Sequence, residues 1–429
     1  MAWNPKKVWP LTVASLVTYS GLLNGADVGE SGNQSGEHPI VLRDQAATAP
    51  LLSYSSPSRE YNNYSQKSKP AENPMTAVDL NEETPFLSDT RYEVQGGANL
   101  FMTADFLYWT AREKGLAYAI KDGFRGVSTV PGFLSESSPG HHAKVKEIGH
   151  TWNPGWRVGL GYNTPHDKWD LYLNWTHYRQ DVHNSVHAND HQQIFTLWQV
   201  NPLNALTGRS FSCFCTEAKG EWKLHYDTLD LELGRSFGFT PHLSLRPHVG
   251  VRAARIYQDF EIHYKNLFEN RNADNARVRA IPKLDTDMRN HFLGLGLRGG
   301  VDTKWKFTRD WGVFANGSGS ILWGRFNDKV KDKIIGQPLL VPSGTSMVDL
   351  HDHHVSFVGN LQIALGMSWD HYFSDHRYHL GLTLGWEQLI WFNQNQLDHL
   401  DSESVAGQFF KETSNLGLSG VTLGARFDF

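Results

Sequence analysis

Histidine is frequent in this chain, with 21 among 429 residues, and imidazole is the commonest metal ligand among side chains. Two clusters could bring several imidazoles together: "HNSVHANDH" and "HDHHV", which contain His183, His187, His191, His351, His353 and His354. A metal site needs donors that converge on one point. The flanking residues are typical of polar loops, and nothing in them orients the rings. We therefore expect exposed loop histidines, no metal site and no cofactor.

Acid–base catalysis would need paired acids together with a His–Asp couple. Asp352 with His353 is a candidate couple, although any histidine-rich segment supplies one. No HExxH motif occurs, so the zincin signature is absent. GxSxG occurs once, as "GRSFG" (234–238), at the end of a strand-like segment that leads into a predicted short turn and not into a helix, so the strand–turn–helix setting of a hydrolase nucleophile is missing. Glycine clusters such as "GLGLRGG" fall within strand-like segments and are not phosphate loops. We expect no enzymatic activity.

The two cysteines, Cys213 and Cys215, occur as "CFC". Residues this close rarely form an unstrained disulfide with each other. They are either thiols without a partner chain or the site of an intermolecular disulfide that links the protein to its neighbours in a cysteine-bonded envelope. The sequence leaves both readings open.

Apolar and polar residues alternate strictly in the segments that carry the charged residues, which indicates β-strands. In "VSFVGNLQIALGMSWD" (355–370), Val355, Phe357, Leu361 and Ile363 share one face with the later apolar residues. Successive side chains of a strand point to opposite faces, so one face is apolar and the other polar. The same pattern recurs in segments 169–178, 243–253, 293–305, 378–387 and 415–429.

The polar face of these strands carries charges of both signs. They are Asp105, Arg157, Asp170, Asp230, Glu232, Arg246, Arg252, Arg298, Asp302, Lys304, Glu387 and Arg426. If the strands close into a barrel, these residues are pore-lining candidates that bias which ions enter. The alternative is that the charges pair across a narrow lumen and block it.

Connections of two lengths alternate along the chain. Short turns are expected at 163–168, 238–243, 307–310 and 373–377, and long polar loops at 111–151, 180–220, 261–288, 326–354 and 393–414. Outer-membrane barrels have short periplasmic turns, long outer loops and an even number of strands. The pattern predicts an all-β fold, a transmembrane antiparallel β-barrel of ten strands, or twelve if 115–120 adds a hairpin.

The two ends of the chain differ from its middle. Residues 1–26 have the charges and apolar stretch of a signal peptide. Residues 27–97 are polar and rich in Pro, Ser and Asn, which predicts a disordered, flexible periplasmic leader, with a loosely held plug inside the barrel as the alternative. Residues 98–429 form the barrel. Many such barrels end on an aromatic strand that the barrel-assembly machinery reads, so Phe427 and Phe429 are the expected insertion signal.

Composition excludes two other classes. The net charge is −5 and the pI is about 6.5, so no basic surface indicates nucleic acid. After the N-terminus no run of 18 apolar residues occurs, which excludes a helical membrane protein.

The segment "ANLFMTADFLYWTAREKGLAYAI" (98–120) resembles the Legionella-type pore-forming outer-membrane protein family. That family includes the major-outer-membrane-protein-like porins of chlamydia-related bacteria. Later stretches such as "PGWRVGLGYN" (154–163) and "RPHVGVRAARI" (246–256) are similar in style. The resemblance implies a barrel in the outer membrane of a Gram-negative bacterium with a water-filled pore, and it supplies no catalytic residues.

The expected function is that of a porin for passive diffusion of ions and small hydrophilic solutes. The first alternative is a closed structural or adhesive barrel acting through its outer loops, and the second is an omptin-like protease. Expected partners are outer-membrane lipid, the assembly machinery, the solutes, and either a homo-oligomer or disulfide-linked neighbours.

Overall fold

The computed structural model describes residues 92, 94, 96–122, 143–189, 192–198, 213–270, 277–336, 346–374, 376–401 and 408–429. The predicted signal peptide (1–26) and nearly all of the predicted leader (27–97) lie outside these residues. The chain divides into two units, Met1–Val78 and Asp79–Phe429, and every described residue belongs to the second. Among the described residues no helix is long and apolar enough to cross a membrane.

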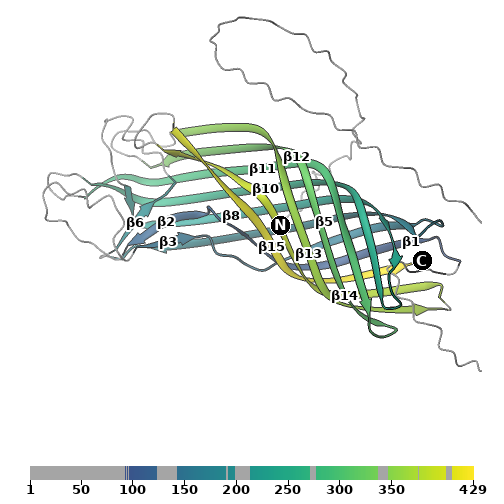
Figure 1. Ribbon diagram of the computed structural model, residues 1–429. Coiled ribbons are helices and arrows are strands. Elements are labelled where there is room, and N and C mark those ends of the chain that lie inside the picture. The colour runs from purple at the N-terminus through teal and green to yellow at the C-terminus, as the bar shows by residue number, and fades with distance from the viewer. Residues whose placement is uncertain are drawn as a thin grey trace, which may run out of the picture. The chain divides into compact units, whose positions relative to one another are not determined.

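Ten long strands form a closed antiparallel barrel (Figure 1), which confirms the predicted fold and strand number. The ring closes because β15 pairs with β1 as well as with β14, and β10 with β11. In ring order the strands are β1 (Leu100–Glu113), β4 (Asn153–Asn163), β5 (Trp169–His187), β8 (Glu217–Arg235), β10 (Leu243–Asn270), β11 (Arg277–Lys306), β12 (Trp311–Ile335), β13 (Ser346–Phe373), β14 (Tyr378–Asp401) and β15 (Gln408–Asp428).

The first and last strands meet at one end of the barrel. Phe101 pairs with Asp428, and the backbone N–H of Phe429 donates to the carbonyl of Leu100 at 3.0 Å. The predicted short turns connect β4 to β5, β8 to β10, β11 to β12 and β13 to β14 at this same end. Since short turns are periplasmic in outer-membrane barrels, we call it the periplasmic end.

Five short strands are not members of the ring of ten. They are β2 (Ala117–Asp122), β3 (Lys144–Glu147), β6 (Gln193–Thr196), β7 (Cys213–Cys215) and β9 (Phe237–Gly238). β7 pairs with the far end of β10, and β6, β2 and β3 follow it in order. We call β2, β3, β6 and β7 the inner sheet. Because β2 joins this sheet and not the ring, the twelve-strand alternative is wrong.

Three of the predicted long loops, 261–288, 326–354 and 393–414, are largely strand, which corrects the sequence-based interpretation. β10 continues to Asn270, β12 to Ile335, and β13 begins at Ser346. His183 and His187 accordingly lie on β5, and His351, His353 and His354 on β13. His191 lies outside the described residues. In a strand, residues four apart are separated by about 13 Å, so His183 and His187 do not converge.

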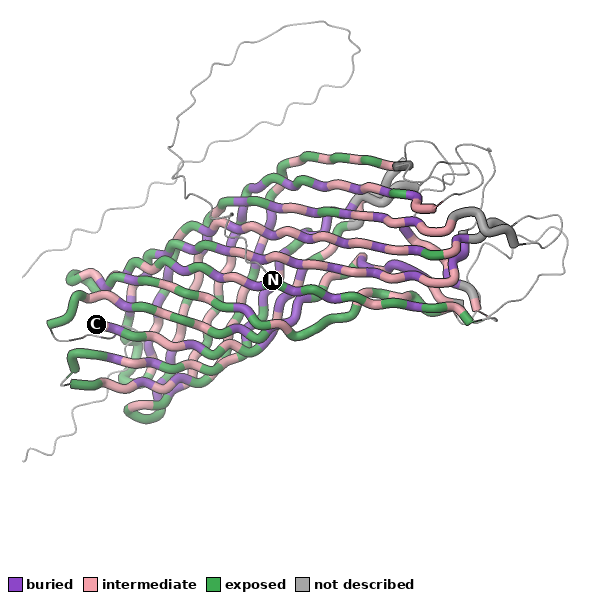
Figure 2. The backbone as a smooth tube through the Cα atoms, turned by 180° about the vertical axis from the view of Figure 1, so that it is seen from behind, coloured by how far each residue is buried: buried purple, intermediate pink, exposed green. Residues whose placement is uncertain are grey.

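The reason is that the alternation continues through these segments with its faces exchanged, as β11 shows. Near the periplasmic end, Leu295 and Leu297 are 63% and 73% exposed on the outside while Arg298 is buried inside. Toward the other end, Phe292 and Met288 are fully buried inside, and charged residues occupy the outside. Figure 2 shows buried and exposed residues alternating along each strand.

The exchange divides the barrel into two parts. The membrane-spanning part has the outward apolar side chains, which include Val158, Leu173, Leu231, Val251, Leu295, Trp323, Phe357, Ile363, Leu384 and Leu423. The outer part lies beyond it, with polar residues outside and an apolar core inside, as in a water-soluble barrel. Polarity on the outer face therefore resembles a loop in the sequence, although these segments are strands that pair with at least one neighbour.

Candidate functional site

The interior of the membrane-spanning part holds a cavity of about 310 Å³, which we call the chamber. Every charged side chain singled out from the sequence as pore-lining points to the interior. All of them except Asp170 line the chamber, and Asp170 is buried beside Arg246. The chamber wall includes residues of all ten ring strands, so the barrel itself shapes it.

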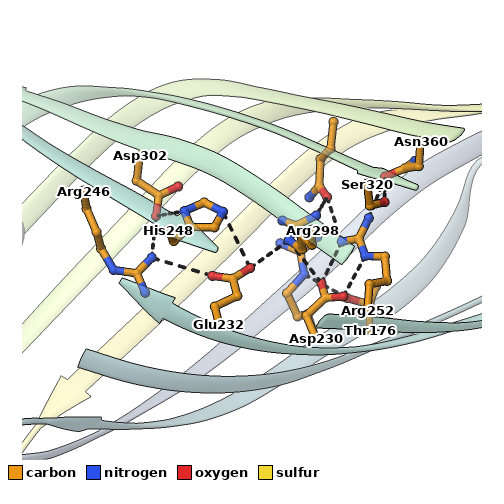
Figure 3. A network of polar contacts seen from close by, with 12 residues as sticks. Thr176, Asp230, Glu232, Arg246, His248, Arg252, Arg298, Asp302, Ser320 and Asn360 are labelled. Atoms are coloured by element: carbon orange, nitrogen blue, oxygen red, sulfur yellow. Dashed lines mark hydrogen bonds and ion pairs between the residues drawn. The ribbon is translucent and has the colours of Figure 1, made fainter. Parts of the chain in front are cut away.

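Near the periplasmic end, Arg246 joins three acids. Its Nε lies 2.9 Å from Asp170 Oδ2, and its Nη1 lies 2.7 Å from Asp302 Oδ2 and 3.7 Å from Glu232 Oε2. His248 lies between two of these acids, 3.6 Å from Asp302 and 3.9 Å from Glu232 (Figure 3). The alternation on β8, β10 and β11 brings these side chains together, because each stands on the inward face.

A second pair lies deeper in the chamber. Arg252 donates two hydrogen bonds of 2.6 Å to the carboxylate of Asp230, and a third, also 2.6 Å, to Asn360 Oδ1. Arg298 donates to Glu232 at 2.8 Å (Figure 3). Arg252 and Asp230 are each 2% exposed. Buried charges persist when they are paired and hydrogen-bonded in this way.

One amide carries the network across the lumen. Gln362 on β13 accepts hydrogen bonds of 3.1 Å from both Arg252 and Arg298, and its Nε2 donates to Glu387 on β14 at 2.5 Å. Glu387 in turn accepts from Arg157 on β4 at 2.8 Å, and Arg157 reaches Asp105 on β1 at 3.3 Å. The lining charges are therefore paired in this conformation, as one part of the alternative expected, but they leave the chamber between them.

The outer end of the chamber is closed by an apolar layer. Tyr226 and Leu389 belong to both the chamber wall and the apolar core. Trp391 on β14 reaches across to β8 and β10, 6.0 Å from the Tyr226 ring and 5.9 Å from the Arg252 guanidinium. The residues of the apolar layer are each at most 1% exposed. They are Leu107, Trp109, Tyr178, Tyr226, Ile256, Phe292, Leu322, Val358, Leu389, Trp391 and Leu418.

Above this layer the inner sheet fills the outer part. Tyr264 on β10 donates to the carbonyl of Tyr118 at 2.6 Å, and Thr286 on β11 donates to the carbonyl of Trp198 at 3.1 Å. The Trp198 ring packs edge-on against Phe260 at 6.2 Å. Since Tyr264, Thr286 and Phe260 face inward, these contacts place the inner sheet inside the barrel.

One group of metal-type donors occurs among the described residues. Asp328, Asp352 and His354 bring their donor atoms within 4.8 Å of one another in the outer part. The ammonium of Lys411 lies 2.8 Å from Asp352 Oδ2 and 4.0 Å from Asp328. The hydrogen bond from Lys411 holds the pKa of Asp352 below its usual value. A side-chain cation thus supplies the positive charge that this group would otherwise draw from an ion.

Two further sequence-based candidates can be placed. Asp352 and His353 are neighbours on β13 and point to opposite faces, so they do not form the catalytic couple considered above. Cys215 is buried at 3% exposure, and the side chain of Cys213 lies outside the described residues. A disulfide to a neighbouring protein remains a prediction.

Sequence reasoning missed the residues that close the chamber. Trp391 and Tyr226 can be found from the sequence, because counting every second residue from Glu387 along β14 and from Asp230 along β8 gives the inward positions. The signal was an apolar residue at an inward position, which marks where a polar lumen ends. Gln362 carries no charge and was passed over for that reason.

A family model described as the Legionella pneumophila major outer membrane protein precursor matches residues 98–429. The chain belongs to this family. It is an outer-membrane protein, as the closed barrel with its outward apolar belt also indicates. No curated protein matches the chain.

Several solved structures are similar at low identity. The outer-membrane protease OmpT from Escherichia coli is 9% identical, with a TM-score of 0.32, over 81% of this chain and 99% of that one. A Pseudomonas aeruginosa FadL homologue is 9% identical, with a TM-score of 0.22, over 77% and 89%. The Pseudomonas putida toluene transporter TodX is 7% identical, with a TM-score of 0.24, over the same shares. Such values carry no argument about function.

Proposed function

We propose that this protein is a porin through which ions and small hydrophilic solutes diffuse passively. The observation that carries the proposal is the chamber, a charged cavity of about 310 Å³ inside the part of the barrel that lipid surrounds. Charged and polar side chains in this position stabilise water and ions where the surrounding bilayer does not.

The lining favours weak ion selectivity. Chamber residues of both signs lie in contact with one another, as in the pairs Arg157–Glu387 and Arg298–Glu232. A permeating cation or anion therefore meets a partner of opposite charge at each level. Neither sign dominates the field along the path, so neither ion is strongly excluded.

The apolar layer makes the pore a gated one. Ions do not cross a layer of packed apolar side chains, because hydrophobic constrictions close by losing their water. In the described conformation the chamber ends at Tyr226, Leu389 and Trp391, so conduction requires that this layer and the inner sheet above it move. The open state is accordingly a minor one, and the conductance is intermittent.

Single-channel recording in planar bilayers tests the proposal with the refolded full chain and the variant Trp391→Ala. We expect brief discrete steps that scale with salt, and a larger open fraction in the variant because it removes the largest side chain from the layer. Trp386→Ala is the matched control, since Trp386 stands on the same strand but faces lipid at 49% exposure. Flat traces from both the wild-type protein and Trp391→Ala, once insertion is demonstrated, would reject the porin.

A second candidate is a closed envelope barrel that acts through its outer part. The observation that favours it is the packing of the outer part, where an apolar core and the inner sheet fill the interior. This candidate gives flat traces with every variant, whereas the porin gives steps whose frequency depends on Trp391.

A further inference from the structure

The interior of the barrel at the periplasmic end contains an aromatic side chain that does not belong to the barrel. Tyr92 precedes β1, which begins at Leu100, and it is only 6% exposed. Its ring stacks on that of His379 from β14, with centroids 3.5 Å apart and planes 12° apart. Tyr92 also lines the chamber. The residues just before the barrel therefore turn back into its opening.

Cations surround the ring of Tyr92. Lys304 Nζ and Lys306 Nζ lie 5.0 and 5.6 Å from its centroid. The Arg426 guanidinium lies 5.0 Å from the same centroid and 3.8 Å from that of Phe101. A cation within about 6 Å of a ring face is attracted to the ring quadrupole, and more strongly where water is excluded. Two strands, β11 and β15, supply these cations, and Phe101 on β1 lies on Arg426.

The phenol oxygen is held as firmly as the ring. It donates a hydrogen bond of 2.6 Å to Asp370 Oδ1 and contacts the ammonium of Lys304. Asp370 is itself paired with Lys304 at 2.6 Å and Lys306 at 3.6 Å. Phenylalanine would satisfy the cations but not the carboxylate, and serine would satisfy the carboxylate but not the cations. The contacts thus match a tyrosine specifically.

The walls of this site are buried and paired with one another. His379 and Asp428 are both fully buried and lie 2.8 Å apart, Nδ1 to Oδ2, and Arg426 lies 2.7 Å from Asp428. A Cβ added at Gly97 would lie 2.7 Å from the backbone carbon of Phe429 and 2.8 Å from Val94, so the connecting segment passes close against the end of β15. The approach to the site is as closely fitted as the site itself.

We propose that these residues form a docking site for Tyr92 and that the docked ring is a plug which closes the periplasmic end of the chamber. The plug is an internal ligand, tethered a few residues from β1, so its effective concentration is high and release is brief. The role in transport rests on the proposed porin function, whereas the docking itself does not. The apolar layer and Tyr92 then close the chamber from opposite ends.

Access to the chamber from the periplasmic end tests the plug without requiring conduction. Ser368 is an inward residue on β13, one inward position beyond Asp370, and it lines the chamber. In a background with Cys213→Ser and Cys215→Ser, the substitution Ser368→Cys places one thiol behind the plug. The measurement is the rate at which a small charged thiosulfonate modifies this thiol in the folded, detergent-solubilised full chain.

We expect Tyr92→Ala to raise the modification rate about 100-fold, since it removes the cation–π contacts and the hydrogen bond together. Tyr92→Phe keeps the ring and should raise the rate about tenfold. Tyr378→Ala is the matched control, because Tyr378 lies at the same end but faces outward at 43% exposure, and it should leave the rate unchanged. Equal rates for wild type and Tyr92→Ala, or an equal rise with Tyr378→Ala, would overturn the plug.

The same variants separate this proposal from the porin proposal. If the thiol becomes accessible in Tyr92→Ala while the bilayer traces stay flat, the plug stands and the porin fails. If wild-type traces show steps whose size and frequency Tyr92→Ala leaves unchanged and the thiol rate is also unchanged, the porin stands and the plug fails.

Discussion

At the scale of single residues, burial decides what a charge in this barrel contributes. The side chains of Arg252 and Asp230 are almost completely buried. Arg255, three residues along the same strand, faces outward beside Asp227, with 43% of its side chain exposed. Removing one partner of a buried pair leaves an uncompensated charge, but removing one partner of an exposed pair costs little.

Arg252→Ala should lower the free energy of unfolding by about 3–5 kcal/mol, because Asp230 would lose its two 2.6 Å hydrogen bonds and stay buried with only Arg298, 3.8 Å away. Arg255→Ala should lower it by less than about 1 kcal/mol. Urea titration of the protein refolded in lipid vesicles measures both. Similar losses in the two variants would show that the chamber is far wetter than the packed network indicates.

Asp352 gives a pH dependence in the outer part. Its hydrogen bond from Lys411 depresses its pKa in the folded state, so its contribution to stability is present above the ordinary carboxyl pKa and is lost as pH falls through the depressed value. The pair is partly exposed, with 39% of the Asp352 side chain accessible, so the effect should stay below about 1 kcal/mol.

Asp352→Asn removes this dependence. The difference in unfolding free energy between wild type and variant should be measurable at neutral pH and should vanish in acid, below the depressed pKa. Urea titrations at a series of pH values provide the comparison. A difference that persists unchanged in acid would mean that the charge of Asp352 is not what stabilises the pair.

At the scale of the strand, the exchange of faces sets the position of the membrane. On β11 the outward residues change from Leu295 and Leu293 to His291 and Arg289 within a few residues, while the inward residues change from Arg298 to Phe292. The point of exchange marks where lipid gives way to water outside and where the polar chamber gives way to an apolar core inside.

Substitutions on either side of this point should differ in cost. Leu295→Lys should destabilise the inserted barrel by about 2–4 kcal/mol, the cost of a cation facing the middle of a bilayer. Arg289→Leu, six residues away on the same outward face, should change stability by no more than about 1 kcal/mol. Urea titration in vesicles tests both, and equal costs would mean that the membrane boundary is misplaced.

The sequence was sufficient for the strands of the membrane-spanning part and for the inward direction of residues such as Arg252 and Asp230. The prediction of loops in the outer part was wrong because the polarity of segments such as that around His351 indicates loops. The alternation of inward and outward residues nevertheless continues there, as Phe260 and Tyr264 on β10 show. Contacts such as Gln362 with Glu387, or Trp391 with Tyr226, join residues through the closed shape of the barrel. Periodicity along one strand contains no information about them.

At the scale of the whole molecule, two closures lie in series on one path. Tyr92 occupies the periplasmic end of the chamber, and the layer around Trp391 occupies its outer end. A path closed at two points conducts only when both are open, so the open probability is the product of the two if they move independently.

The measurement that tests this most directly is planar-bilayer conductance of wild type, Tyr92→Ala, Trp391→Ala and the double variant, each shown to be folded and inserted. We expect rare steps in wild type, more in each single variant, and in the double variant an increase that multiplies the two single effects. A double variant that remains as silent as the wild type would contradict a gated aqueous path through the chamber.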